Sequence, residues 1–173
     1  MTVEDMFPHA EVVTSAIGPD VADRVRAGIT GYQRYALLDR GSYEVAPVGD
    51  ADLLHRVCGL GARRLGRELV AIEGRVLRLR AGDYLLARHD RDRHLLDGRP
   101  VELVLDLSPA PVESEIQYRR RGQVFFRVPC VPRSLAIVER TPVITCNHTY
   151  VSKRVLGVEV IRLVVLASYT SSR

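Results

Sequence analysis

Residues 70–87 read VAIEGRVLRLRAGDYLLA, and here the hydrophobic period of the chain changes to two. From this point to residue 169, short runs rich in Val, Ile, Leu and Tyr are separated by Gly, Pro, Asp and Arg. The later runs are VELVLDLS (101–108), SEIQYRRRGQVFFRVP (114–129), SLAIVER (134–140), PVITCNHTYV (142–151) and VEVIRLVVLASY (158–169). Roughly seven or eight short strands at spacings of about 8–12 residues are typical of an all-β sandwich or barrel.

The part of the chain before this stretch carries helical signals. The segment GPDVADRVRAGI (18–29) predicts a helix with Asp20 as its cap. A second helix is predicted over 49–69, beginning at Asp50. Between the two, YQRYALLDRGSYEV (32–45) predicts two short strands around a central Gly-Ser turn.

Helices in front and strands behind favour an α+β arrangement that is mostly β, not alternating βαβ units. We therefore predict a double-stranded β-helix, or jelly roll, with the N-terminal helices packed on one face. Residues 1–173 form one domain in this interpretation, with a helical part over 1–68 and a jelly-roll core over 69–168.

Composition narrows the class of protein. The net charge is +4, and 25 basic residues are balanced by 21 acidic ones. The densest basic cluster is RRRG (119–122), and the chain has no Trp, so stacking platforms for nucleic-acid bases are scarce. The composition therefore argues against a nucleic-acid partner.

The sequence also predicts a location. No apolar run is long enough to span a membrane, and the acidic N-terminus lacks the layout of a signal peptide. Cys58, Cys130 and Cys146 show no CxxC spacing and are interpreted as buried thiols in a reducing compartment. We expect a cytoplasmic protein.

The stretch GDYLLARHDRDRH (82–94) ends a predicted strand in histidines and acids. Two histidines and one carboxylate can occupy one face of an iron ion. His89 with Asp90 or Asp92, together with His148 in TCNHTYV, could form such a set. Taken singly, each has a plainer explanation: a solvated His89, turn-forming aspartates, and a hydrogen-bonded core His148.

Arg162 lies in a strand that is apolar on both of its alternating faces. A guanidinium buried there without a partner is disfavoured by several kcal/mol, so Arg162 needs a carboxylate. That carboxylate could belong to a bound ligand, held bidentately, or to Asp106 or Glu102 in a structural bridge. Arg154 is a second candidate for the ligand clamp.

The order of these residues resembles the Fe(II)/2-oxoglutarate-dependent oxygenases over roughly residues 75–167, and most of all their prolyl-hydroxylase-like branch. The resemblance rests on GDYLLARHD, VELVLDLS and the closing pattern of His148, Gly157 and Arg162. It implies Fe(II) held by His89, Asp90 (or Asp92) and His148. It also implies 2-oxoglutarate held by Arg162, with hydroxylation as the default reaction. Tyr118 and Tyr150 could line this pocket.

One feature departs from that family. Its metal clasp is His-x-Asp, because alternate strand residues point the same way. Counting from Gly82, the position of the first histidine falls on Arg88, with His89 one residue late. Either a bulge re-aims His89 beside Asp90 or Asp92, or the metal site is lost.

Two other functions remain open on the sequence alone. One is a catalytically degenerate jelly-roll binding module without iron. The other is a cupin-type metal enzyme using His89, His94, His148 and Glu102, although its H-x-H motif is absent. For an oxygenase, the expected substrate is amino-acid-like, peptide- or carrier-bound, or a small metabolite. A short chain leaves the pocket open, or completed by a second subunit or another partner.

Overall fold

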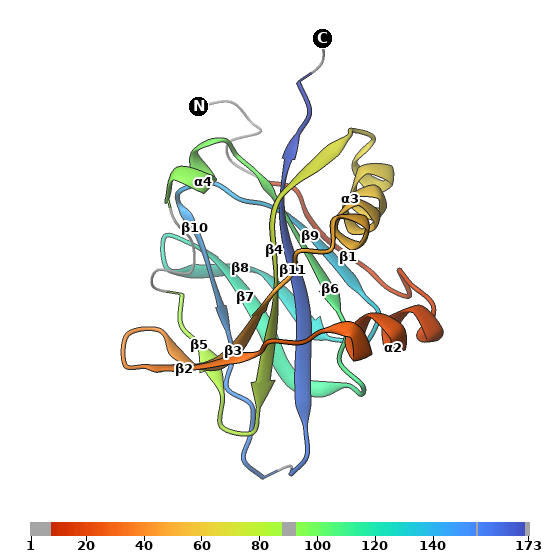
Figure 1. The fold of residues 1–173 in the computed structure, drawn as a ribbon. Coiled ribbons are helices and arrows are strands. Elements are labelled where there is room, and N and C mark those ends of the chain that lie inside the picture. The colour runs from red at the N-terminus through yellow and green to blue at the C-terminus, as the bar shows by residue number, and fades with distance from the viewer. Residues whose placement is uncertain (1–7, 88–92, 155, 172–173) are drawn as a thin grey trace.

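The computed structural model describes residues 8–87, 93–154 and 156–171 (Figure 1). Within this part of the chain, eleven strands form one antiparallel sheet flanked by three helices. The strands are β1 (Ala10–Val13), β2 (Gln33–Leu37), β3 (Gly41–Pro47), β4 (Leu69–Arg80), β5 (Tyr84–Leu85), β6 (Val101–Asp106), β7 (Val112–Arg120), β8 (Gln123–Cys130), β9 (Leu135–Glu139), β10 (Ile144–His148) and β11 (Glu159–Tyr169). The helices are α2 (Pro19–Gly28), α3 (Ala51–Leu65) and α4 (Arg93–Asp97).

The sheet runs in the order β1-β9-β6-β11-β4-β3-β5-β10-β7-β8, with β2 attached to β3. Its longest pairing joins β4 to β11, and β11 pairs with β6 on its other side. In Figure 1 these strands stand at the centre, with α2 and α3 to one side and β5 and β10 to the other. The arrangement confirms the predicted mostly-β jelly roll with helices on one face.

Strand β11 is buried on both faces, as its sequence predicted. Ile161, Leu163 and Val165 belong to the core beneath the helices, whereas Val160 and Val164 belong to the core enclosed by the sheet. Strand β6 alternates in the same way, since its neighbouring side chains divide between the two cores. Arg162 is therefore directed into the interior of the sheet, on the face of Val160 and Val164.

Helix α3 begins as the sequence predicted. The Asp50 side chain accepts hydrogen bonds from the backbone N–H groups of Asp52 and Leu53, which satisfies two free donors of the first turn. At Gly61 the helix lies against β6 so closely that an added Cβ would stand 2.7 Å from Leu103 Cδ2. This glycine lowers the helix propensity, but it permits the close approach of the helix to the sheet.

The predicted cap of the first helix was wrong by two residues. Gly18 occupies the cap position and Pro19 the first turn, so Asp20 lies inside the helix. Proline suits this place because its fixed φ is helical and its missing N–H would have had no partner. The Asp20 carboxylate still lies in the first turn, where it interacts favourably with the positive end of the helix dipole.

The sheet also extends into residues 8–68, where the two strands predicted over 32–45 are β2 and β3 and where β1 was not predicted. Strand β1 pairs with β9, and β3 pairs with both β4 and β5. The β2–β3 turn spans residues 38–40, so Gly41 begins β3 and does not sit at the turn centre. A Cβ on Gly41, at φ 131°, would collide with the carbonyl oxygen of Tyr84, so this position requires glycine.

The three cysteines are buried and free, as predicted. Among the described residues, none of the helices has the length and apolar character needed to cross a bilayer.

Candidate functional site

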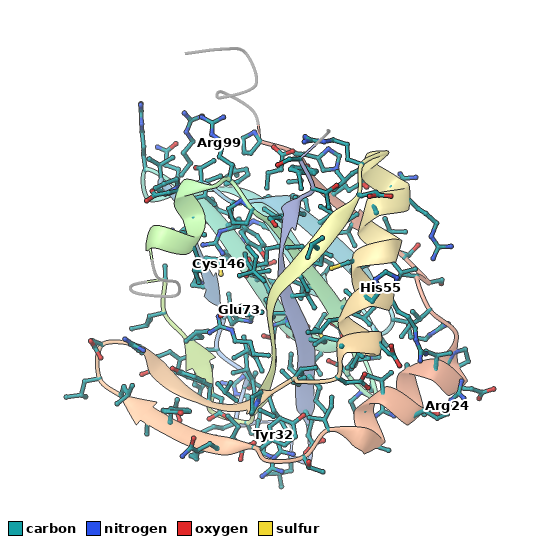
Figure 2. All side chains as sticks on the ribbon, turned by 45° about the horizontal axis from the view of Figure 1, so that its top comes forward. Arg24, Tyr32, His55, Glu73, Arg99 and Cys146 are labelled. Carbon is teal, nitrogen blue, oxygen red and sulfur yellow. The ribbon has the colours of Figure 1, made fainter. Side chains whose placement is uncertain are left out.

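His148 is the predicted iron ligand that the structure describes. It is the last residue of β10, where it pairs with Leu85 of β5 on one side and Ile116 of β7 on the other. Its side chain is only 4% exposed. Cys146, two residues earlier on the same face of β10, lies inside the sheet in Figure 2.

A hollow of about 590 Å³ adjoins His148. Its wall is formed by the end of β5 and the end of β10, with Arg119 of β7 beside them. Tyr150 lines it with 51% of its surface exposed. Its volume is in the range of roughly 300–1,000 Å³ that small-molecule sites occupy.

The other predicted ligands, His89 with Asp90 or Asp92, lie outside the described residues, as does Arg88. Strand β5 nevertheless ends three residues before Arg88 and is hydrogen-bonded to the strand that carries His148. Within residues 8–87, 93–154 and 156–171, no group of three or more His, Cys, Asp or Glu side chains could hold a metal ion. The cupin alternative depended on His89 and on the side chain of His94, which also lie outside this part.

His148 and Arg162 contact each other inside the sheet. Arg162 Nη1 lies 2.9 Å from His148 Nδ1, and Nη2 donates to the carbonyl oxygen of Ser114 at 3.2 Å. A guanidinium has only donors, so Nδ1 must be the acceptor and the neutral imidazole carries its proton on Nε2. Burial, and then the charge of Arg162, hold the pKa of His148 well below its ordinary value of 6.5, so the ring is neutral.

Arg162 has no carboxylate in contact with it among the described residues. It is 1% exposed, and burial lowers the pKa of its guanidinium. Asp106 lies opposite it across the β6–β11 ladder and opposes this shift, but the two side chains form no ion pair within 4 Å. Asp106 instead accepts a hydrogen bond from the backbone N–H of Ser108.

Glu102, the other predicted partner of Arg162, is bound by a different arginine. Its Oε2 accepts hydrogen bonds from Arg140 Nη1 at 2.7 Å and from the Tyr118 hydroxyl at 3.0 Å. Both residues of the ion pair are buried, with side-chain exposures of 0% for Arg140 and 2% for Glu102. Tyr118 is fully buried in this cluster and is not among the residues that line the hollow beside His148. Arg154, the second predicted clamp, is exposed.

Asp83 directly precedes Tyr84, which lines the hollow, and it was not among the predicted site residues. Its carboxylate is 1% exposed and accepts hydrogen bonds from both terminal nitrogens of Arg34, from Ser42 and from the backbone of Arg80. Its backbone N–H and C=O lie in the β4–β5 turn, and its C=O accepts from the N–H of Val151 beyond β10. Asp83 thus joins the β2–β3 hairpin, β5 and the segment after β10. The Gly82-Asp83 pair indicates a turn in the sequence, because both residue types are typical of turns, and Gly82 indeed takes φ 90°.

No protein-family model and no curated protein matches the chain. Solved structures do. An oxidoreductase of the 2OG-Fe(II) oxygenase family from Burkholderia pseudomallei matches with a TM-score of 0.71 at 10% identity, over 92% of this chain and 85% of its own. A Pseudomonas putida prolyl-4-hydroxylase matches with a TM-score of 0.64 at 14% identity, over 97% and 96%.

A third similar structure is the non-heme alpha-ketoglutarate-dependent epimerase SnoN from nogalamycin biosynthesis. It matches with a TM-score of 0.67 at 9% identity, over 93% of this chain and 78% of its own. At these identities the similarity shows the fold alone. The chain has the jelly-roll fold of the 2OG-Fe(II) oxygenases, as the sequence resemblance implied, and that fold carries more than one reaction.

Proposed function

We propose that the protein is an Fe(II)/2-oxoglutarate-dependent oxygenase whose metal is held by His148 together with His89 and Asp90 or Asp92. The observation that carries the proposal is Arg162, a buried guanidinium beside His148 with no carboxylate within 4 Å among the described residues. A buried cation without an anion is costly, and the distal carboxylate of 2-oxoglutarate would remove that cost.

The chain's own residues fit this role in position. His148 lines the hollow and is paired with β5, the strand that precedes residues 88–92. Arg162 donates a hydrogen bond to the His148 ring. Iron bound with 2-oxoglutarate would supply the oxidising power for hydroxylation, while the protein ligates, orients and excludes side reactions. Leu77, Leu79 and Val160 pack in the same interior and keep water from the guanidinium.

The hydrogen bond between the two residues sets a condition on metal binding. To donate the Nε2 lone pair to a metal, His148 must carry its proton on Nδ1. A protonated Nδ1 cannot accept from Arg162, because both groups would then be donors. Arg162 must therefore leave His148 when the metal site is filled.

A second function is favoured by the same contact. In a binding module that has lost its iron, His148 and Arg162 would satisfy each other permanently, and Arg88 would stand where the family has its first histidine. This alternative predicts no metal binding, and it makes the His148–Arg162 contact a feature of the working protein.

The first experiment is an anaerobic Fe(II) titration with and without 2-oxoglutarate, following the iron-to-2-oxoglutarate charge-transfer band. The oxygenase proposal predicts a band that saturates near one iron per chain and is lost in His148→Ala. The matched control is His55→Ala, an exposed histidine on α3, which should leave the band intact. Absence of a band in the wild-type protein would favour the binding module.

The state of the His148 ring gives a readout that does not depend on turnover. Nitrogen chemical shifts of the metal-free protein should place the proton on Nε2, whereas a Zn²⁺-loaded sample should place it on Nδ1. An apo protein with the proton already on Nδ1 would contradict the hydrogen-bond assignment.

For the substrate, we propose an amino-acid-like group that is peptide- or carrier-bound, or a small metabolite. The hollow is bordered by exposed apolar surface at Leu86 and Tyr150, which suits a group presented from outside. A substrate screen that finds turnover only with free small amino acids would contradict the peptide- or carrier-bound version.

A further inference from the structure

A groove between α2 and α3 lies on the helical side of the sheet, apart from His148. Two adjoining hollows make it up, of about 420 Å³ and about 340 Å³, and both are lined by Val21 and Val25 of α2 and by Leu53 and Arg56 of α3. Figure 2 labels Arg24 on α2 and His55 on α3, which mark the two walls. The 420 Å³ hollow alone is large enough for a small molecule.

The two hollows differ in chemistry. The larger one is lined by Arg24 and Arg56 from opposite walls, with Thr30 beside them. The smaller one is mainly apolar, with Ile17, Leu60 and the buried Leu105 of β6 among its lining residues, and His55, Arg56 and Arg63 also line it. The groove therefore combines positive charge in both hollows with apolar side chains that predominate in the smaller one.

The two arginines of the larger hollow are available to a ligand. The side chains of Arg24 and Arg56 are exposed, and neither makes a hydrogen bond or ion pair with any residue that the structure describes. Asp50, the one acid lining the larger hollow, is occupied as the cap of α3 and accepts from two backbone N–H groups. No acid lines the smaller hollow. The residues that line the larger hollow thus carry more positive than negative charge, with Arg24 and Arg56 against Asp50.

We propose that this groove binds a free fatty acid, with its carboxylate between Arg24 and Arg56 and its aliphatic chain along Leu60 and Leu105. A single carboxylate can accept from two guanidinium groups, and burial of its chain supplies the apolar part of the affinity. Positive charge beside apolar side chains favours an amphiphilic anion over a wholly polar one. The charge excludes a cationic amphiphile.

The test uses the full-length protein and decanoate below its micelle concentration, with binding measured by calorimetry and located by amide chemical shifts. Decanoate should bind the wild-type protein and shift residues of α2 and α3, while decyltrimethylammonium should not bind. Arg24→Ser combined with Arg56→Ser should weaken decanoate binding by about tenfold or more, because two charge-assisted hydrogen bonds are lost. Decanol binding should change little in this variant.

Arg64→Ser provides the matched control. Arg64 is on the same helix, pairs with Glu11 and does not line the groove, so its loss should leave decanoate affinity unchanged. The proposal is overturned if decanoate does not saturate the wild-type protein, or if Arg64→Ser weakens binding as much as the double variant. Shifts that map away from α2 and α3 would also overturn it. Circular dichroism of each variant confirms that it is folded.

Discussion

Arg162 and Arg140 form a matched pair of buried arginines whose replacement should have very different effects on stability. Both lie inside the sheet, with exposures of 1% and 0%. Arg140 is paired with the carboxylate of Glu102, whereas Arg162 donates to the neutral groups of His148 and Ser114. Methionine is a suitable replacement for each, because it is long, apolar and unbranched.

The magnitudes follow from what each replacement leaves behind. Arg140→Met removes one partner of a buried ion pair, and breaking such a pair in this way costs about 3–5 kcal/mol. For a chain of this length that lowers Tm by roughly 6–20 °C. Arg162→Met breaks no ion pair among the described residues, because Asp106 is not within 4 Å of Arg162. It relieves a desolvation penalty of several kcal/mol and loses two hydrogen bonds of roughly 1.5–3 kcal/mol each, so the net change should stay within about 1 kcal/mol.

The assay is urea unfolding of the metal-free protein, followed by circular dichroism, with midpoint and slope fitted for each variant. We expect Arg162→Met to unfold close to the wild-type midpoint and Arg140→Met far below it. Equal large losses would refute the reasoning, because Arg162 would then be held in place by structural need alone. The case for a ligand carboxylate at Arg162 would lose its main support.

Two further predictions concern stability outside this pair. Burial raises the pKa of Asp83, but hydrogen bonds led by that from Arg34 outweigh it and hold the pKa below the ordinary 3.8. The ionised Asp83 therefore stabilises the fold above pH 3.8, and this stabilisation is lost as the pH falls through the folded-state pKa. Asp83→Asn should unfold at a lower denaturant concentration at pH 7, and its unfolding midpoint should fall less than that of the wild-type protein as the pH is lowered. On α3, Gly59→Ala enters open space and should stabilise by up to about 1 kcal/mol. In Gly61→Ala the added Cβ would clash with Leu103, so this variant should be less stable by about 1–3 kcal/mol. Thermal melts should show Tm rising in Gly59→Ala and falling in Gly61→Ala, and a shift in the same direction would contradict the argument.

The sequence predicted the jelly roll well because period and burial agree in its strands. In β11 successive side chains meet different cores, so the run is apolar on both faces apart from Arg162 and could be recognised without a partner strand. Strand β1 escaped prediction because it has four residues, all of them half-buried, and carries too little pattern. Helix α4, of five residues, was missed for the same reason.

The candidate site was harder to predict than the fold. The apolar strand around Arg162 indicated that this residue needs a partner. The identity of the partner depends on contacts between strands, which the sequence pattern does not give. Glu102 and Asp106 looked equivalent on one face of β6, yet Arg140 reaches Glu102 because it follows β9, the strand beside β6. Pairing of this kind is fixed by strand order, which the local pattern does not encode.

The contact between His148 and Arg162 links the two ligands of the proposed oxygenase. In the metal-free chain Arg162 donates to His148 Nδ1, so the His148 ring has the wrong tautomer for a metal at Nε2 and the Arg162 guanidinium already has an acceptor. If His148 bound a metal through Nε2, its proton would lie on Nδ1 and Arg162 would lose this acceptor, so the buried guanidinium would then gain most from a bound carboxylate. Binding of the metal and of the dicarboxylate should therefore be mutually reinforcing, since linkage is reciprocal. A protein that keeps this contact for structural reasons alone would show no such coupling.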